Sequence, residues 1–439
     1  MMHVPGSRGS GKLRPLPHLL RMFWAGSVAA FGLMVVVAWV ERAMGFSHWH
    51  YNPLSGDRYQ DLMEFPPVYR MLHTASFYDG IGNSRVAYPP LGMVVYAVVY
   101  ATGHAIGVYL TTAGMWLAGC VLGLRRALMR EGINGLEATL FPLTVALVSF
   151  PIAGLLQRGN IEMFLWMLTA LGVWAFWRGK HETAAVLWGL AAAMKLYPVV
   201  LLAMLLPRPS YISESRCVAP KSWRSFLMGV ATFAGVTLAS LKWLGPTTGI
   251  AWHGAVRNVF GYQGMRAMQW TLHELMANHS AYNLAKFAAM MSGVPLAHLT
   301  LPYYAAGAAV LAWAWFARLW KMPAANQLLA LAVFMVALPP VSYFYTLVQL
   351  YAPWTVLVFI AVRAEREGVE VQGLKQAMLL MLPLFATFML FTFPRIFLFG
   401  GLVQALVLIW LFGWAVKVRF SAETVRVEIG SGADRSAVG

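Results

Sequence analysis

Hydrophobic residues occur along this chain in long continuous runs that are separated by short polar stretches. Most runs approach the roughly 20 apolar residues that a helix needs to cross a bilayer. They lack the weak alternation over about ten residues that is typical of membrane β-strands. The pattern therefore predicts an all-α polytopic membrane protein. The predicted spans cover residues 22–40, 136–156, 163–177, 226–244, 303–317, 328–345, 347–362, 374–391 and 397–416.

Two apolar stretches do not fit a single straight span. Residues 89–124 are too many for one helix and too few for two, and the basic residues that follow favour one net crossing, broken at 103–107. Residues 184–206 are interrupted by Lys-Leu-Tyr-Pro, and each half rises only about 16 Å as a helix. We expect a re-entrant hairpin with Lys195 and Pro198 at its apex, because broken backbone at membrane depth is tolerated where it lines a cavity.

Composition and charge exclude a soluble or nucleic-acid-binding protein. Charged residues make up 11% of the chain and hydrophobic residues 59%, whereas a soluble chain carries roughly 25% charged residues. The net charge of +16 comes from basic residues in short clusters beside the apolar runs. Such clusters mark cytoplasmic loops, so we expect membrane lipids and no nucleic acid as partners.

The same charge rule gives the expected topology. The basic tail 1–21 and the polar tail 417–439 lie in the cytoplasm, and the latter is expected to be disordered. Residues 22–416 form a single transmembrane domain, and we interpret its first run as a retained signal anchor. The loop 41–88 and the segment 245–302 then lie on the outer side of the membrane.

The first outer loop concentrates carboxylates, because four of the chain's 17 acidic residues lie in it: Asp57, Asp61, Glu64 and Asp79. A carboxylate at the mouth of a membrane cavity can act as a general base or hold a cation. Asp57 and Asp61 have the spacing that places two side chains on one helix face. The alternative interpretation is an ordinary solvated loop.

Two further polar groups interrupt the apolar runs. The sequence "QRGNIE" places Arg158, Asn160 and Glu162 at the outer end of a span, where the alternative is a helix cap with a favourable dipole contact. Lys195 lies within the membrane, where an unpaired lysine costs several kcal/mol. As a mobile point charge, it would suit the phosphate of a lipid carrier.

The sequence "LPPVSYFYTL" is the last strong candidate. Its two prolines break a helix and present Ser342, Tyr343 and Tyr345, although an aromatic belt at the interface would also explain the tyrosines. Arg395 is a lone outer-face cation, for which the alternative is a loop anchor. The histidines and the two cysteines show no metal-ligand spacing, so no metal site is predicted.

The order "YPPLG", "RGNIE", "GLAAAMKLYPVVLL" and "PPVSYFYTL" resembles glycosyltransferase family 87, the polyprenol-phosphate-mannose-dependent mannosyltransferase-like proteins of the GT-C superfamily. The resemblance covers nearly the whole chain, and "GLAAAMKLYP" is its most specific part. It implies a GT-C-like bundle of about 10–12 transmembrane or re-entrant helices with a long first outer loop.

The resemblance also implies a reaction. A mannose-like hexose would pass, with inversion, from a polyprenyl-phosphate sugar to a hydroxyl of a lipid or glycan acceptor, on the extracytoplasmic face of the cell membrane and without a cofactor. The base would be Asp61, with Asp57 as the second choice, and Lys195 and Arg158 would bind the donor phosphate. The implied substrate-binding residues are Asn160, Glu162, Tyr88, Ser342, Tyr345 and Arg395.

One departure from the family pattern limits this assignment. Family members often carry a His-Tyr pair after the Pro-x-Ser element, whereas the matching positions here are Tyr345 and Thr346. A proton relay at that place is therefore not expected.

The main alternative is a transporter or flippase of a lipid-linked sugar, because secondary transporters also build their sites from broken helices and midplane charges. A transporter would show inverted repeats and polar residues along several spans. Here the polar groups gather near the outer face and the sequence shows no internal repeat, which favours glycosyl transfer.

Overall fold

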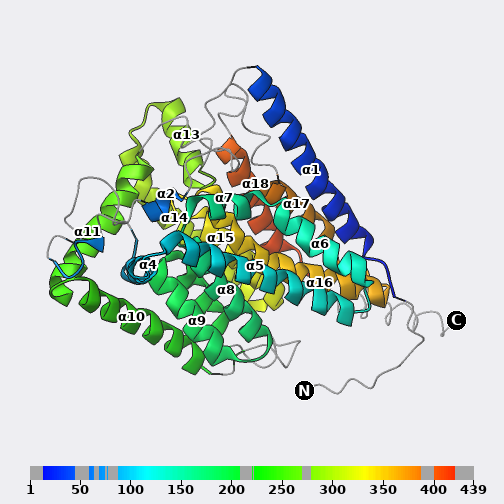
Figure 1. Ribbon diagram of the computed structural model, residues 1–439, viewed down its shortest axis with the longest axis horizontal. Helices are drawn as coiled ribbons and strands as arrows, with labels where there is room; N and C mark the ends of the chain where they lie inside the picture. Colours follow the sequence, from blue (N-terminus) through cyan, green and yellow to red (C-terminus); the bar gives the residue numbers. More distant parts are fainter. Residues whose placement is uncertain are drawn as a thin grey trace.

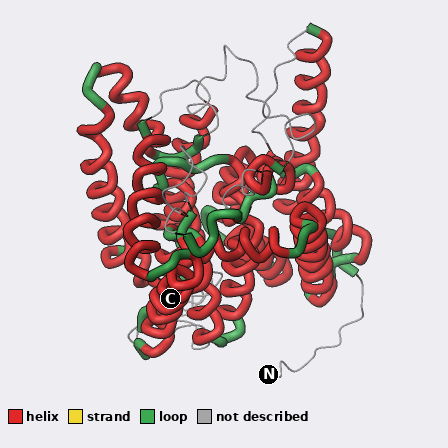
Figure 2. Tube along the Cα trace, turned by 60° about the vertical axis from the view of Figure 1, so that its left-hand side comes forward, coloured by secondary structure: helices red, strands yellow, loops and turns green. Residues whose placement is uncertain are grey.

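The computed structural model describes residues 13–44, 59–63, 69–74, 77, 88–207, 220, 222–268, 278–386 and 400–420. Apart from two isolated β-bridges, Arg14 with Ile133 and Asn278 with Tyr343, these residues form helices, turns and loops (Figure 2). The predicted all-α class is therefore confirmed.

The α-helices of the described residues differ widely in length, and 3₁₀ helices lie between some of them. The α-helices are α1 (His18–Ala43), α2 (Gln60–Met63), α4 (Pro90–Ala101), α5 (Ala105–Arg130), α6 (Gly135–Leu147), α7 (Phe150–Arg158), α8 (Glu162–Trp177), α9 (His181–Met194), α10 (Arg224–Leu244), α11 (Thr248–Ala267), α13 (Tyr282–Ser292), α14 (Leu296–Ala317), α15 (Ala324–Ala337), α16 (Tyr351–Glu367), α17 (Leu374–Ala386) and α18 (Gly400–Lys417). The 3₁₀ helices are η2 (Tyr197–Leu205), η3 (Leu319–Lys321) and η4 (Phe344–Leu350).

Several helices are long and apolar enough to cross a membrane. Among the described residues there are five such units, namely α5, α10, α14 with η3, η4 with α16, and α18. The pair α6 and α7 passes the same test together, although its two helices are bent by 53°. Large apolar side chains remain exposed on α5, α10, α14 and α18, as lipid contact requires. The chain is a multi-pass membrane protein.

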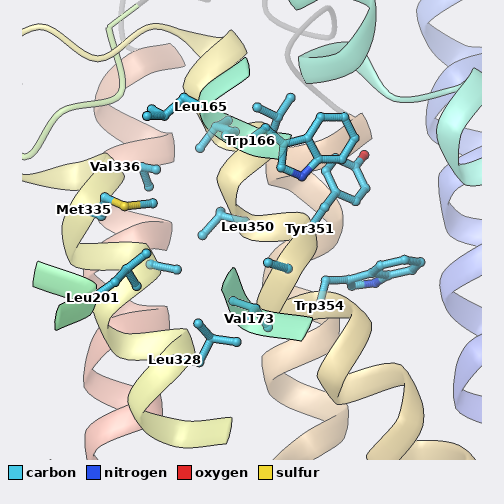
Figure 3. Packing of buried hydrophobic residues seen from close by; sticks show 14 of the residues in the cluster. Leu165, Trp166, Val173, Leu201, Leu328, Met335, Val336, Leu350, Tyr351 and Trp354 are labelled. Atoms are coloured by element: carbon cyan, nitrogen blue, oxygen red, sulfur yellow. The ribbon is translucent and has the colours of Figure 1, made fainter. Parts of the chain in front are cut away.

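The core lies where α8, α15 and α16 meet η2 and η4. Residues Ala325 to Ala337 of α15 are all buried, and Figure 1 shows this helix at the centre, with α1 and α10 at the edges. Figure 3 shows Leu165 and Trp166 of α8 beside Met335 and Val336 of α15 and Tyr351 of α16. Apolar side chains on all sides of α15 mark it as an inner helix.

The two irregular stretches of the sequence are broken where the pattern placed the breaks. The helix α4 ends at Ala101 and α5 begins at Ala105, with Gly103 in a left-handed conformation at φ 72° between them. The helix α9 ends at Met194, and Lys195 has extended backbone with φ −145° and ψ 138°. Beyond it the chain continues as η2.

The chain folds back after Lys195. A Cβ added at Gly229 of α10 would lie 2.6 Å from Leu202 of η2 and 3.3 Å from the carbonyl of Ala185 of α9. Residues near the two ends of the 184–206 stretch thus lie against the same point of α10. This arrangement has the form of a hairpin, and its depth in a membrane remains a prediction.

The predicted span 328–345 is not one continuous helix. The prolines Pro339 and Pro340 were expected to break a helix, and α15 ends at Ala337 while η4 begins at Phe344. Two consecutive residues without an N–H cannot continue the hydrogen-bond ladder. The break that the two prolines predict is therefore confirmed, while the single span 328–345 is not.

Candidate active site

The "RGNIE" sequence forms a tight corner between two helices. The helix α7 ends at Arg158, Gly159 takes a left-handed conformation at φ 65°, and α8 begins at Glu162. A Cβ at Gly159 would lie 2.8 Å from Leu62 Cδ1 of α2, so glycine serves both the turn and the packing. The corner directs Arg158 and Asn160 toward α2 and Glu162 toward the core.

Asp61 is bound by both polar residues of this corner. Its Oδ1 accepts a hydrogen bond from Arg158 Nη2 at 2.7 Å, and its Oδ2 accepts from Arg158 Nε at 3.3 Å and from Asn160 Nδ2 at 2.5 Å. Asn160 Nδ2 also donates to the hydroxyl of Tyr88 at 3.0 Å. The Asp61 side chain is 9% exposed and that of Arg158 is 26% exposed. The pair therefore lies at the edge of the protein interior.

The short helix α2 is fixed from two sides. The backbone N–H of Tyr59 donates to the carbonyl of Gln157 at 2.5 Å, and Tyr59 has a left-handed backbone with φ 58°. On the other side, the hydroxyl of Tyr100 in α4 donates to the carbonyl of Leu62. These contacts surround Asp61 in the sequence, so they hold its carboxylate against the corner.

A second ion pair lies deeper. Glu162 is completely buried, and its Oε2 lies 2.6 Å from Lys195 Nζ. Its Oε1 accepts hydrogen bonds from the Tyr197 hydroxyl and, at 2.7 Å, from Gln349 Nε2. Gln349 Oε1 in turn accepts from the hydroxyl of Thr169 at 2.6 Å. A buried carboxylate with three donors is well compensated, and the pairing offsets the cost of a lysine inside the bundle.

One aromatic ring links the two ion pairs. The ring centroid of Tyr345 lies 5.8 Å from Arg158 Cζ and 5.7 Å from Lys195 Nζ, both within the range of cation–π contacts. Lys195 Nζ also lies 5.5 Å from the ring centroid of Tyr88. Asp61, Arg158 and Lys195 therefore converge on one aromatic-lined place, although they come from three distant parts of the sequence.

Not every predicted site residue belongs to this place. Asp57 and Arg395 lie outside the described residues. Ser342 is buried in a separate polar cluster, where its hydroxyl lies 3.0 Å from His279 Nε2 and 2.9 Å from Thr346 Oγ1. The predicted substrate contact of Ser342 stays a prediction.

Two residues of the site were not among the predicted ones. Tyr197 stands in "KLYP" two residues after Lys195, and Gln349 is a lone amide within an apolar run. The sequence feature that could have pointed to them is an uncharged polar residue inside an apolar stretch, because such a group needs a hydrogen-bond partner in the membrane. The sequence could not indicate that the partner is Glu162.

The chemistry of the site is that of two carboxylates and two permanent or near-permanent cations. Within the described ranges no group of three or more His, Cys, Asp or Glu side chains could hold a metal ion. Arg158 and Lys195, which both lie against the Tyr345 ring, can bind an anion, and Asp61 can accept a proton beside Arg158. This arrangement suits a substitution reaction in which a hydroxyl attacks and the leaving group departs as an anion.

Comparison with known proteins agrees with this chemistry. No curated protein matches the sequence significantly. The family model described as Glycosyltransferase family 87 matches residues 87–340. The match includes Tyr88, the corner and Lys195, while Asp61 and Tyr345 lie outside it. Because it extends over more than half of the chain, this multi-pass membrane protein belongs to glycosyltransferase family 87 and is a membrane glycosyltransferase.

Proposed function

We propose that the protein transfers a mannose-like hexosyl unit from a polyprenyl-phosphate sugar to a hydroxyl of a lipid or glycan acceptor, with inversion at the anomeric carbon. The site faces the extracytoplasmic side of the cell membrane, and both termini are cytoplasmic. The carrying observation is that Arg158 and Lys195 lie against the ring of Tyr345 while Asp61 is paired with Arg158.

Asp61 is the general base of the proposed reaction. It takes the proton of the acceptor hydroxyl while that oxygen attacks the anomeric carbon from the face opposite the phosphate. The bond between the anomeric carbon and the phosphate oxygen breaks, and the phosphate keeps the electron pair. A single displacement of this kind inverts the anomeric centre.

Arg158 and Lys195 stabilise the departing polyprenyl phosphate. Each cation already has one carboxylate partner, at 2.7 Å for Arg158 and 2.6 Å for Lys195. Arg158 is the more exposed of the two, and its planar group can bind carboxylate and phosphate oxygens at the same time. When the phosphate takes over part of this bonding, the Asp61 carboxylate becomes a stronger base for the acceptor. Binding of the donor phosphate to Arg158 therefore makes Asp61 a better base.

The proposed function is tested with purified protein in liposomes that contain a radiolabelled polyprenyl-phosphate mannose or glucose and a lipid or glycan acceptor. The expected result is labelled acceptor with inverted anomeric configuration and release of polyprenyl phosphate, with no transfer from a nucleotide sugar. Movement of the intact donor across the bilayer without bond cleavage would instead identify a flippase and overturn the proposal.

The aromatic ring of Tyr345 should contribute to donor affinity through its contacts with Arg158 and Lys195. Tyr345→Leu removes the ring that lies against Arg158 and Lys195, so the donor KM should rise about 2–30-fold, the equivalent of about 0.5–2 kcal/mol of cation–π attraction. Tyr345→Phe keeps the ring and should stay close to the original KM. Equal effects of the two variants would show that the hydroxyl, and not the ring, is what matters.

A further inference from the structure

A second buried polar cluster lies beside the candidate active site. Residues 278–281, between α11 and α13, run alongside the break that follows α15. The N–H of His279 donates to the carbonyl of Ser342 at 2.9 Å, and the N–H of Ala281 donates to the carbonyl of Ala337 at 2.8 Å. An isolated antiparallel bridge pairs Asn278 with Tyr343. The outer segment therefore binds the chain where α15 stops.

This contact satisfies groups that the two prolines leave without a helix partner. The side chain of Asn278 donates to the carbonyl of Pro340 at 2.8 Å, and its Oδ1 accepts from the N–H of Ser342 at 2.9 Å. The hydroxyl of Ser280 donates to the carbonyl of Ala337 at 3.2 Å. The side chains of Asn278 and Ser280 are fully buried. Buried backbone groups need such partners.

His279 reaches further, into the first turn of η4. Its Nε2 lies 3.0 Å from Ser342 Oγ and 3.2 Å from Thr346 Oγ1. The Ser342 hydroxyl donates to the carbonyl of Val336 at 2.6 Å, and the Thr346 hydroxyl donates to the carbonyl of Tyr343 at 3.0 Å. Both hydroxyl protons are thus engaged, so Nε2 carries the ring proton and donates to the two oxygens.

The imidazole is neutral. Complete burial lowers the pKa of His279 to about 3, because the charged form would lose its hydration. Nδ1 then carries only a lone pair, and it has no hydrogen-bond partner in the described part of the chain. His279 therefore acts as a fixed donor and not as a proton carrier.

The helix that His279 binds carries two side chains of the candidate active site. Tyr345 lies between Ser342 and Thr346 in the sequence, and one turn later Gln349 binds Glu162. A 3₁₀ helix has poorer hydrogen-bond geometry than an α-helix, so its orientation depends on outside contacts. The contacts of His279 lie on both sides of Tyr345.

We propose that His279 is a positioning residue of the active site. By donating to Ser342 and Thr346, it fixes the first turn of η4 so that the ring of Tyr345 lies against Arg158 and Lys195. The residue touches no substrate and acts through Tyr345. Its expected effect on donor affinity rests on the proposed function.

The first test compares three variants in the transfer assay. His279→Phe keeps a flat ring and removes the donor, so the donor KM should rise about 2–30-fold, as for loss of the Tyr345 contact, while the acceptor KM changes little. His279→Gln can place an amide N–H where Nε2 lies and should restore the KM. Ser280→Ala is the matched control, because it weakens the same segment at α15 without touching η4. A donor KM that is equal in His279→Phe and Ser280→Ala would overturn the proposal.

A double-mutant cycle tests the route through Tyr345. In the Tyr345→Leu background, His279→Phe should cause no further increase in donor KM, because the contact that it positions is already gone. Independent effects that multiply would contradict the proposal, since coupled residues are non-additive. If His279→Phe fails to fold, Thr346→Val removes one of the two acceptors at equal volume and takes its place in the cycle.

A labelling experiment separates this proposal from the proposed function. In a Cys120→Ala, Cys217→Ser background, Tyr345→Cys introduces a thiol on η4, and its reaction rate with a maleimide is measured without substrate. Adding His279→Phe should raise the rate at least about 10-fold, because local opening of the turn then costs about 1.4 kcal/mol less. Adding Ser280→Ala should not. An unchanged rate with His279→Phe overturns the positioning role whether or not the protein transfers sugar.

Discussion

Asp61→Asn should lower the rate of sugar transfer by about 10²–10⁴-fold, because an amide cannot take the proton of the acceptor hydroxyl. Asparagine is nearly the same size, so the corner around Asn160 and Gly159 should keep its shape. The loss should appear in kcat, with the donor KM changed less. The measurement is the initial rate of labelled acceptor formation in proteoliposomes at saturating donor.

Three further measurements show whether the loss is specific to the Asp61 carboxylate. Glu182→Gln neutralises a carboxylate of an exposed ion pair, 3.0 Å from Arg224, and should leave the rate unchanged. Thermal unfolding of Asp61→Asn shows whether Arg158 without its carboxylate has destabilised the fold. Asp57→Asn tests the second-choice base. Full activity in both the Asp61 and Asp57 variants would show that neither carboxylate is the base and would overturn this part of the proposed mechanism.

The second large effect is expected at the buried pair of Glu162 and Lys195. Glu162→Gln should lower the free energy of unfolding by about 3–5 kcal/mol, because it leaves the buried ammonium without its carboxylate. Lys195→Met should be destabilising for the opposite reason. The double variant should recover much of this stability, since no uncompensated charge remains. Thermal or denaturant unfolding of the four proteins in one detergent completes the cycle.

Donor affinity in the same four proteins separates a structural from a functional lysine. A hydrogen bond to a charged group contributes about 1.5–3 kcal/mol, so loss of Lys195 should raise the donor KM about 10–100-fold. The double variant should fold well and still bind the donor poorly. A stable double variant with the original donor KM would show that Lys195 only balances Glu162.

An ion pair on the surface provides a reference value for the coupling energy of the buried pair. Glu182 and Arg224 form an ion pair whose side chains are largely exposed. The same cycle there, with Glu182→Gln and Arg224→Met, should give a coupling energy of about 0–1 kcal/mol. A similar value at Glu162 and Lys195 would contradict the view that the deep pair is isolated from water.

Sequence pattern alone was enough for the membrane class and for most breaks between helices. Apolar runs and basic clusters are local properties, and the bilayer converts them directly into spans and loops. The break at Lys195 was readable because a charged residue interrupts the apolar run there and Pro198, three residues later, cannot continue a helix. The break after α15 was also readable from Pro339 and Pro340, although the long apolar run around them gave one span, 328–345, where the structure has two elements.

The sequence by itself thus determined the all-α membrane class, the position of Lys195 at a break and the family resemblance that the comparison confirms. Only the tertiary structure decided the pairing of Asp61 with Arg158, of Lys195 with Glu162, and of His279 with the turn that carries Tyr345. The physical reason is that apolar helices can pack in many orders at similar cost, since the lipid itself is apolar. Which polar groups meet is fixed only when the helices have packed and each buried charge has found its partner.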